Sequence, residues 1–298
     1  MTEFFHALFD PAVPFLRFAL LAGVLSSVAF GTVGTFVVAR RISYIAGAVA
    51  HSVLGGVGVA LYLRRSLGFT WLTPFHGAVV AALLSALVIG WVSLAARERE
   101  DTVIGAIWAV GMAVGLLFIA ATPGYFDPMS YLFGNILMIS TSDLWVIAGL
   151  DAVVLLVAFR FLAEFQAICF DEEFARARGL PVNRLYLLLL CLTALTVVLL
   201  VSVVGIVMVV ALLTLPAAAA GGVTQKLGHM IGLAILLCLL FTSGGVALSF
   251  MLDLRSGPVI ILLAATAYLV LALGRRMLAG AFSKKRMADE SPQGMTGL

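Results

Sequence analysis

The chain has 298 residues, of which 63% are hydrophobic and 11% are charged, and its formal net charge is +3 at pH 7. A soluble domain carries about a quarter charged residues, so this composition excludes a soluble fold and indicates a protein that uses the lipid bilayer as its solvent. The small net charge gives no reason to expect a nucleic-acid partner.

The apolar segments predict an all-α, polytopic membrane protein with eight to nine transmembrane helices, each of which needs roughly 20 mostly apolar residues. The expected spans are 15–39, 42–63, 75–96, 102–121, 144–162, two passes within 185–220, 227–251 and 258–273. The charge-free run 185–220 would be about 54 Å long as one helix, well beyond a hydrocarbon core of about 30 Å. We therefore expect a turn near Ser202–Gly205. Eight spans remain if 205–220 or the first segment does not cross fully.

Basic residues orient these spans. With the N-terminus outside, the loops assigned to the cytoplasm hold most of the 18 Lys and Arg residues, as the positive-inside rule requires. The first 14 residues contain no Lys or Arg, so we do not expect a cleavable signal peptide. Residues 1–280 are expected to form one transmembrane domain. Residues 281–298 are expected to form a polar cytoplasmic tail without ordered structure.

Two ionisable residues fall inside predicted spans. An ionisable group at membrane depth is costly, so by default it lines a cavity or has an internal partner. His51 is either a hydrogen-bonded core histidine or a transient metal ligand, since imidazole suits zinc, manganese or iron. Asp151 is either a pathway residue or a structural partner. The sequence leaves both alternatives open.

A long interior segment with a dense cluster of mixed charges lies at 165–184. Within it, 171–179 can form a short amphipathic helix with Phe170 and Phe174 on one face, ended by Gly179 and Pro181. This segment is either a cytoplasmic docking loop or a solvated loop. On the opposite side, 122–139 is rich in aromatic and turn residues. We expect a re-entrant piece there, with Phe126, Tyr131 and Phe133 as an apolar gate.

Four stretches resemble the zinc/manganese/iron ABC transporter permeases. They are RISYIAGAVAHS at 41–52, YLFGNIL at 131–137, FDEEFARARG at 170–179, and VGIV with LLTLPAAAA within 204–220. These motifs occur in the family's order over most of the chain. The resemblance implies a type II ABC importer-like permease of the bacterial inner membrane, with His51 in a metal pathway. Family members commonly carry an acidic residue four positions before the histidine, where this chain has Gly47. We expect another acid, with Asp151 as the candidate, or a different way of handling the ion.

The resemblance also implies the partners. They are a cytoplasmic ABC ATPase dimer, an extracytoplasmic metal-binding protein, a second permease copy (identical or paralogous) and membrane lipid. The divalent metal is the transported substrate, no cofactor is held permanently, and ATP belongs to the ATPase. The coupling segment would insert into an ATPase cleft, and its expected residues are Asp171, Glu172, Glu173, Phe174, Ala175, Arg178 and Gly179.

Two other function classes compete with an ATP-driven metal importer. A gradient-driven metal carrier or channel usually has several intramembrane carboxylates, and Asp151 alone is thin support for one. An intramembrane enzyme needs a nucleophile–base pair or a cluster of metal ligands. The sequence shows no HExxH or GxSxG motif, and it has no GxxxxGK[ST] phosphate loop, so ATP hydrolysis would require another chain. We therefore expect a transport subunit and not an enzyme.

Overall fold

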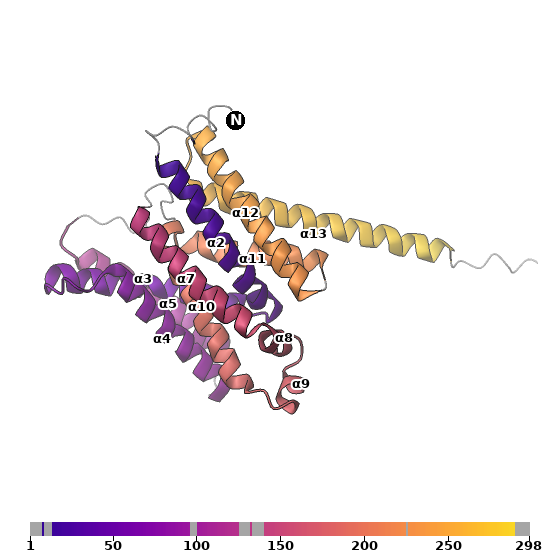
Figure 1. The fold of residues 1–298 in the computed structure, drawn as a ribbon, viewed down its shortest axis with the longest axis horizontal. Helices are drawn as coiled ribbons and strands as arrows, with labels where there is room; N and C mark the ends of the chain where they lie inside the picture. The colour runs from indigo at the N-terminus through magenta and orange to yellow at the C-terminus, as the bar shows by residue number, and fades with distance from the viewer. Residues whose placement is uncertain are drawn as a thin grey trace, which may run out of the picture.

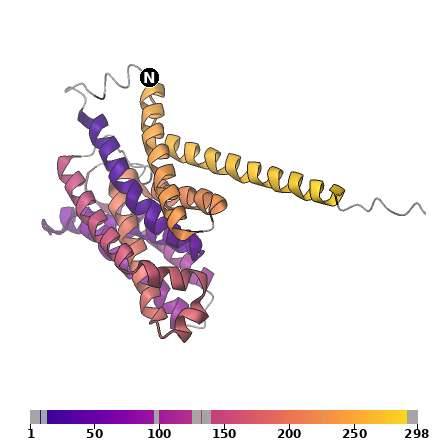
Figure 2. The same cartoon turned by 45° about the vertical axis from the view of Figure 1, so that its right-hand side comes forward.

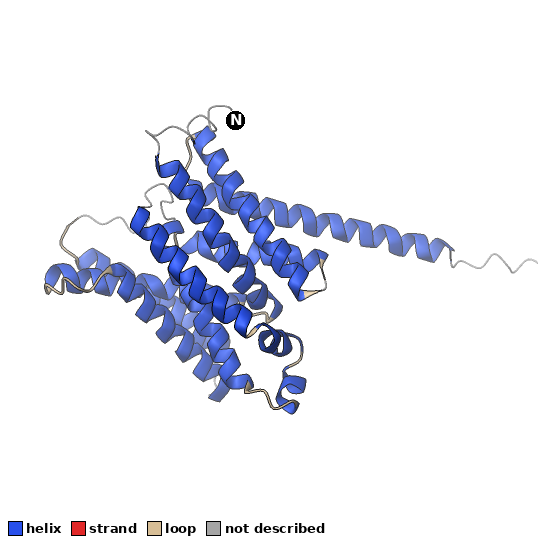
Figure 3. Ribbon diagram, in the orientation of Figure 1, coloured by secondary structure: helices blue, strands red, loops and turns tan. Residues whose placement is uncertain are grey.

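The computed structural model describes residues 8, 14–95, 100–124, 132, 140–224 and 226–289, and all regular structure in this part of the chain is helical (Figure 3). The helices are α2 (Pro14–Ala39), α3 (Ser43–Ser66), α4 (Pro74–Ala95), α5 (Glu100–Ala121), α7 (Thr141–Arg160), α8 (Leu162–Phe170), α9 (Glu172–Ala177), α10 (Val182–Val204), α11 (Ile206–Val223), α12 (Leu227–Leu252) and α13 (Ser256–Asp289).

Eight of the described helices are long and apolar enough to cross a membrane: α2, α3, α4, α5, α7, α11, α12 and α13. The 23-residue α10 is a further apolar helix, and its apolar part includes Val182–Val198. The prediction of an all-α polytopic protein with eight to nine spans is therefore confirmed, and each predicted span coincides with one helix to within a few residues at its start.

The helices form two packed groups joined by α10 (Figure 1). In one group α3 packs against α4 and α5. In the other, α2 packs against α7, α11 and α12, and α13 packs against α11 and α12. Helix α10 touches both groups, through α3 and α4 on one side and through α2, α7 and α11 on the other. The groups also touch directly, where α3 packs against α11, and the α2–α3 turn connects them along the chain. Movement of one group relative to the other must therefore alter these contacts as well as those of α10.

Glycine residues bring α3 unusually close to its neighbours. A Cβ atom at Gly56 would lie 2.0 Å from the carbonyl oxygen of Gly77 in α4, and one at Gly58 would lie 2.5 Å from the carbonyl oxygen of Gly115 in α5. A Cβ at Gly111 would lie 2.6 Å from Cα of Ser52. Without a hydrophobic driving force between helices in lipid, such close backbone approach supplies the van der Waals contact that holds spans together.

The expected turn in the run 185–220 lies at Gly205. Its φ of 87° is in the left-handed region that favours glycine, and it separates the end of α10 from the start of α11. One residue thus divides a charge-free run into two helices. The run carries no other sequence signal strong enough to place the break.

One end of the bundle gathers the segments that were predicted to be cytoplasmic. A cavity of about 390 Å³ at this end is lined by residues from the α2–α3 turn, the end of α4, the start of α5, α9 and the start of α10. A neighbouring cavity is lined by the end of α2, Phe170, the end of α11, the start of α12 and Arg275. The structure therefore brings together the loops that the positive-inside rule assigns to one side.

Helix α13 is longer than expected. It was predicted to end near Leu273, but it continues to Asp289 and projects away from the bundle in both views (Figures 1 and 2). Residues 274–289 are rich in Arg, Met, Leu, Ala and Lys and contain no proline, so their intrinsic helix propensity favours continuation. The first part of the predicted tail is thus helical, while 290–298 lies outside the described residues.

Candidate functional site

His51 lies in the first half of α3 and is half-buried. Its imidazole stacks on the indole of Trp108 in α5, with ring centroids 4.3 Å apart and ring planes 17° apart. Its Nδ1 atom is buried and has no hydrogen-bond partner in the described part of the chain. A buried polar atom without a partner costs about 1–3 kcal/mol, and the described part of the chain offers nothing that offsets this cost for Nδ1.

Trp108 also covers the position where the resembling family carries an acid. Gly47 lies one helical turn before His51, and a Cβ atom there would lie 3.1 Å from Cζ3 of Trp108. The indole therefore occupies the space beside Gly47 that a longer side chain would need. This contact could not be predicted from the sequence, because Trp108 lies in another helix with an ordinary apolar pattern.

Asp151 lies near the middle of α7, on the buried stripe formed by Ile147, Asp151, Val154 and Ala158. Its side chain is 4% exposed, and both carboxyl oxygens are buried without a hydrogen-bond partner among the described residues. Helix α7 packs on α2 and α10, whereas His51 faces α5. The structure therefore does not bring Asp151 and His51 to one site in a single chain. The described residues also contain no group of three or more His, Cys, Asp or Glu placed to hold a metal ion.

The charged loop forms the predicted short helix, α9. Asp171 caps its N-terminus by accepting a hydrogen bond from the backbone N–H of Phe174 at 2.9 Å. At the other end, Gly179 has φ 80°, its N–H donates to the carbonyl of Arg176, and the N–H of Leu180 donates to the carbonyl of Ala175. This pair of bonds is a Schellman motif, which usually requires glycine at the left-handed position.

The two faces of α9 differ. On the outer face, Phe170 and Phe174 are 64% and 53% exposed, Glu173 is exposed, and the Arg178 guanidinium lies 4.9 Å from the centre of the Phe174 ring. On the inner face Ala175 is buried. Exposed aromatic side chains beside charged ones are typical of a protein-docking surface rather than of a solvated loop.

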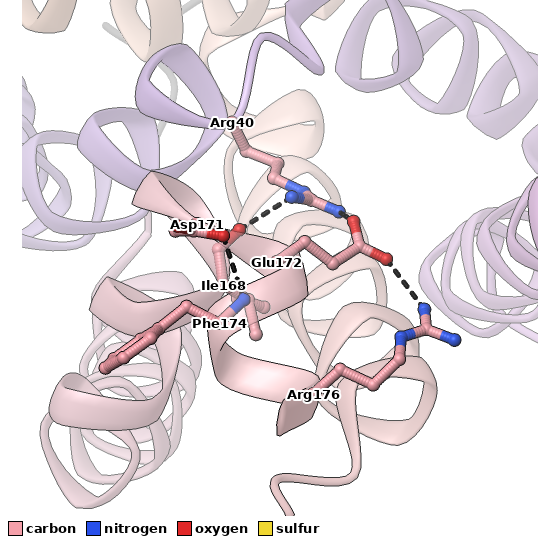
Figure 4. A network of polar contacts seen from close by, with 6 residues as sticks. All are labelled: Arg40, Ile168, Asp171, Glu172, Phe174 and Arg176. Carbon is pink, nitrogen blue, oxygen red and sulfur yellow. Dashed lines mark hydrogen bonds and ion pairs between the residues drawn. The ribbon is translucent and has the colours of Figure 1, made fainter. Parts of the chain in front are cut away.

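Glu172 ties the inner face of α9 to the end of α2. Its carboxylate accepts hydrogen bonds from Arg40 and, at 2.9 Å, from Arg176 (Figure 4). The bond from Arg40 holds the pKa of the Glu172 carboxyl below its usual value, so this group is charged at neutral pH. In the sequence, Arg40 is one of the Lys and Arg residues that the positive-inside rule assigns to the cytoplasm. Its role as a contact could not be found from sequence, since its partners lie about 130 positions away.

One cavity among the helices has a lining that does not include His51. It has a volume of about 640 Å³, lies between α3, α4 and α5, and has an almost wholly apolar lining. The side chains expected to form the outer gate, Phe126, Tyr131 and Phe133, lie outside the described residues.

Helices of spanning length, an imidazole within one of them and a short charged helix at one end of the bundle are the features that a comparison with known proteins has to explain. The sequence pattern of the ABC 3 transport family matches residues 12–275, and the chain belongs to this family. It is 35% identical over 269 residues to the manganese transport system membrane protein MntC of Halalkalibacterium halodurans, covering 90% of this chain and 89% of that protein. It is 38% identical over 264 residues to a Chlamydia trachomatis protein named "Probable metal transport system membrane protein", covering 88% of this chain and 90% of that protein.

Among solved structures, PsaBC from Streptococcus pneumoniae in complex with Fab is similar, with a TM-score of 0.79 and 31% identity, covering 91% of this chain and 94% of that chain. The chain is thus a metal-type ABC transporter permease, a non-enzymatic, multi-pass subunit in the bacterial inner membrane. The resemblance that the motifs carried is confirmed.

Proposed function

We propose that this chain is the membrane-spanning subunit of an ATP-driven importer of manganese, zinc or iron. It would work with a cytoplasmic ABC ATPase dimer, an extracytoplasmic metal-binding protein and a second permease copy. The printed names of the relatives support metal as the substrate class and make manganese the first ion to test.

The observation that carries the proposal is the state of His51. A half-buried imidazole at membrane depth, with one nitrogen that has no partner among the described residues, is available as a metal ligand. A single imidazole without nearby acids binds a divalent ion weakly, and a transport site must release its ion. Because α5 leaves much of its surface exposed, a second copy placed against this side would supply a second imidazole to the same pathway.

The docking function of α9 follows from its exposed face. Glu173, Phe174 and Arg178 point away from the helices that hold α9, and Gly179 sets the geometry of its end. We assign this face to the ATPase cleft. Asp171 and Ala175 support the shape of α9: Asp171 caps its N-terminus, and the buried Ala175 packs against the bundle.

The experiment that tests the proposal measures uptake of Mn²⁺, Zn²⁺ and Fe²⁺ into vesicles that contain this chain, its ATPase and its binding protein, with and without ATP. We expect one metal to accumulate only with ATP, and His51→Ala to abolish or strongly reduce uptake while the complex still assembles. Normal uptake by His51→Ala would remove this residue from the pathway. Reversing the charges of 171–173 should release the ATPase, and retained co-purification and transport would refute the docking assignment.

Asp151 is the observation that favours the alternative, a gradient-driven metal carrier or channel. A buried carboxyl that has no hydrogen-bond partner in the described part of the chain can exchange a proton during transport. Uptake that ignores ATP, follows an imposed pH gradient and is lost in Asp151→Asn would establish this alternative. ATP-dependent uptake that survives Asp151→Asn would leave Asp151 with a structural role only.

A further inference from the structure

Arg40 occupies the link between the two helix groups. Helix α2 ends at Ala39, and α3, which carries His51, begins at Ser43. The turn between them is tight: the N–H of Arg41 donates to the carbonyl of Val38, and the N–H of Ile42 donates to that of Val37. Arg41 has φ 63°, so α2 ends in the same type of motif as α9, here without glycine. A turn bonded in this way passes displacement of Arg40 directly to the start of α3.

The Arg40 side chain reaches three other elements. Its Nη1 donates to the carbonyl of Ile168 in the last turn of α8 at 2.6 Å, and its Nη2 donates to the Glu172 carboxylate of α9 (Figure 4). Its guanidinium carbon lies 5.5 Å from the centre of the Tyr186 ring in α10. The side chain is 20% exposed. A planar guanidinium can make these contacts at once, whereas a lysine ammonium is a point charge that cannot keep both bonds in the same geometry.

Glu172 carries this contact into the docking helix. Its second oxygen accepts from Arg176 one turn further along α9, so the carboxylate is held between two arginines. It lies next to Asp171, the N-cap, and its position is therefore fixed by the first turn of α9. A rotation or shift of α9 must either break the bond to Arg40 or pull Arg40 with it.

We infer that Arg40 is a positioning residue that transmits movement of the docking helix α9 to α3 and so to His51. This inference rests on the proposed function, in which α9 binds the ATPase. Arg40 lies outside the proposed docking face and would connect α9 to the membrane-spanning helix α3. His51 lies about 12 Å along α3 from Ser43, close enough for a tilt at the start of α3 to move the imidazole relative to Trp108.

The experiment uses the complete complex in vesicles and measures metal taken up per ATP hydrolysed. In Arg40→Ala we expect the ATPase to co-purify and hydrolyse ATP, while uptake per ATP falls at least about tenfold. Arg40→Lys should recover part of this ratio. The double variant Arg40→Glu/Glu172→Arg should take up more metal per ATP than either single variant, because it restores the ion pair with the charges exchanged. Glu172→Gln provides a second test that keeps the bond from Arg40 to Ile168.

Arg160→Ala is the matched control. Arg160 also pairs with a glutamate, Glu164, and also lies beside an aromatic ring, that of Phe161, but these contacts stay within α7 and α8. We expect the Arg160→Ala variant to take up as much metal per ATP as the natural chain. An unchanged ratio in both Arg40→Ala and Glu172→Gln would overturn the inference while the proposed function stands. Loss of ATPase binding in both Arg40→Ala and Glu172→Gln would show that the contact only maintains the structure of α9, and this result would overturn the inference as well. Metal uptake without any ATPase would refute the proposed function itself, and the inference with it.

Discussion

Gly47 and Trp108 form a complementary pair beside His51. The indole stacks on the imidazole and also fills the space one turn earlier on α3, where glycine leaves room for it. A carboxylate at position 47 would therefore meet the ring of Trp108. Beside His51 the protein thus presents an aromatic surface in place of a negative charge. If the proposed ion pathway passes this point, the attraction for a divalent ion is weaker than a carboxylate would provide.

Restoring the acid should strengthen metal binding only if the indole is removed at the same time. In Gly47→Asp/Trp108→Ala we expect the Kd for Mn²⁺ to fall at least about tenfold, equivalent to about 1.4 kcal/mol, because a carboxylate and an imidazole then share one helix face. Titration calorimetry of the purified protein measures this change. We expect Gly47→Asp alone to lower the melting temperature, since the new Cβ crowds Trp108.

Gly47→Asn/Trp108→Ala separates charge from space in this test. Asparagine has nearly the same shape as aspartate but no charge. Equal tightening in the Asn and Asp double variants would mean that opening the site, and not the carboxylate, controls affinity.

Single residues also show the limit of reading this site from sequence. The place of His51 inside a span and the short helix in the charged segment could be predicted, because an imidazole within an apolar run and a charge cluster between apolar runs are local signals. Trp108 and Arg40 could not, because each acts through a partner on another helix. The position of Asp151 within its own span was predictable, but its separation from His51 depends on which neighbours α7 packs against.

At the level of elements, the geometry of α9 depends on one backbone conformation. Gly179 has φ 80°, and a Cβ atom there would have no neighbour within 4 Å. Gly179→Ala therefore adds left-handed strain of about 1 kcal/mol without any clash. We expect this strain to distort the end of α9 and to weaken binding of the ATPase severalfold, as measured by its co-purification and by ATP-dependent uptake.

Gly68 provides a control with the same chemistry at the other end of α3. It has φ 77° and likewise no atom within 4 Å of its Cβ position, but it lies far along the chain from the docking loop. Gly68→Ala should cause similar strain and leave ATPase binding unchanged. Equal loss of binding in both variants would show that general destabilisation, and not the shape of α9, explains the effect.

The elements themselves were largely predictable because the bilayer imposes their length. Runs of about 20 apolar residues bounded by charges specify helices, so the predicted spans agree with α2, α3, α4, α5, α7 and α12. The break in 185–220 was expected from length alone and lies at Gly205. The end of α13 was missed, since a change from apolar to basic residues marks the end of a span but does not end a helix.

At the scale of the whole molecule, the two ends of the bundle differ in the helix ends and loops that lie there. Two cavities lie at one end of the bundle. They are lined by the α2–α3 turn, the start of α5, α9, the start of α12 and Arg275. Helices α3 and α12 both begin there, so the loops that follow them belong to the opposite end. This arrangement agrees with an orientation argued only from the distribution of Lys and Arg.

Cysteine labelling in intact cells tests that orientation. In a variant with Cys169, Cys191 and Cys238 replaced by Ala, cysteines introduced one at a time at four exposed positions cover both ends: Thr70, Arg255, Asp101 and Lys226. A membrane-impermeant maleimide should label the Thr70→Cys and Arg255→Cys variants in intact cells. It should reach the Asp101→Cys and Lys226→Cys variants only after permeabilisation, because those residues lie at the end that carries α9. The reverse pattern would place α9 outside the cell, where no ATPase could reach it, and would refute the orientation and the docking role together.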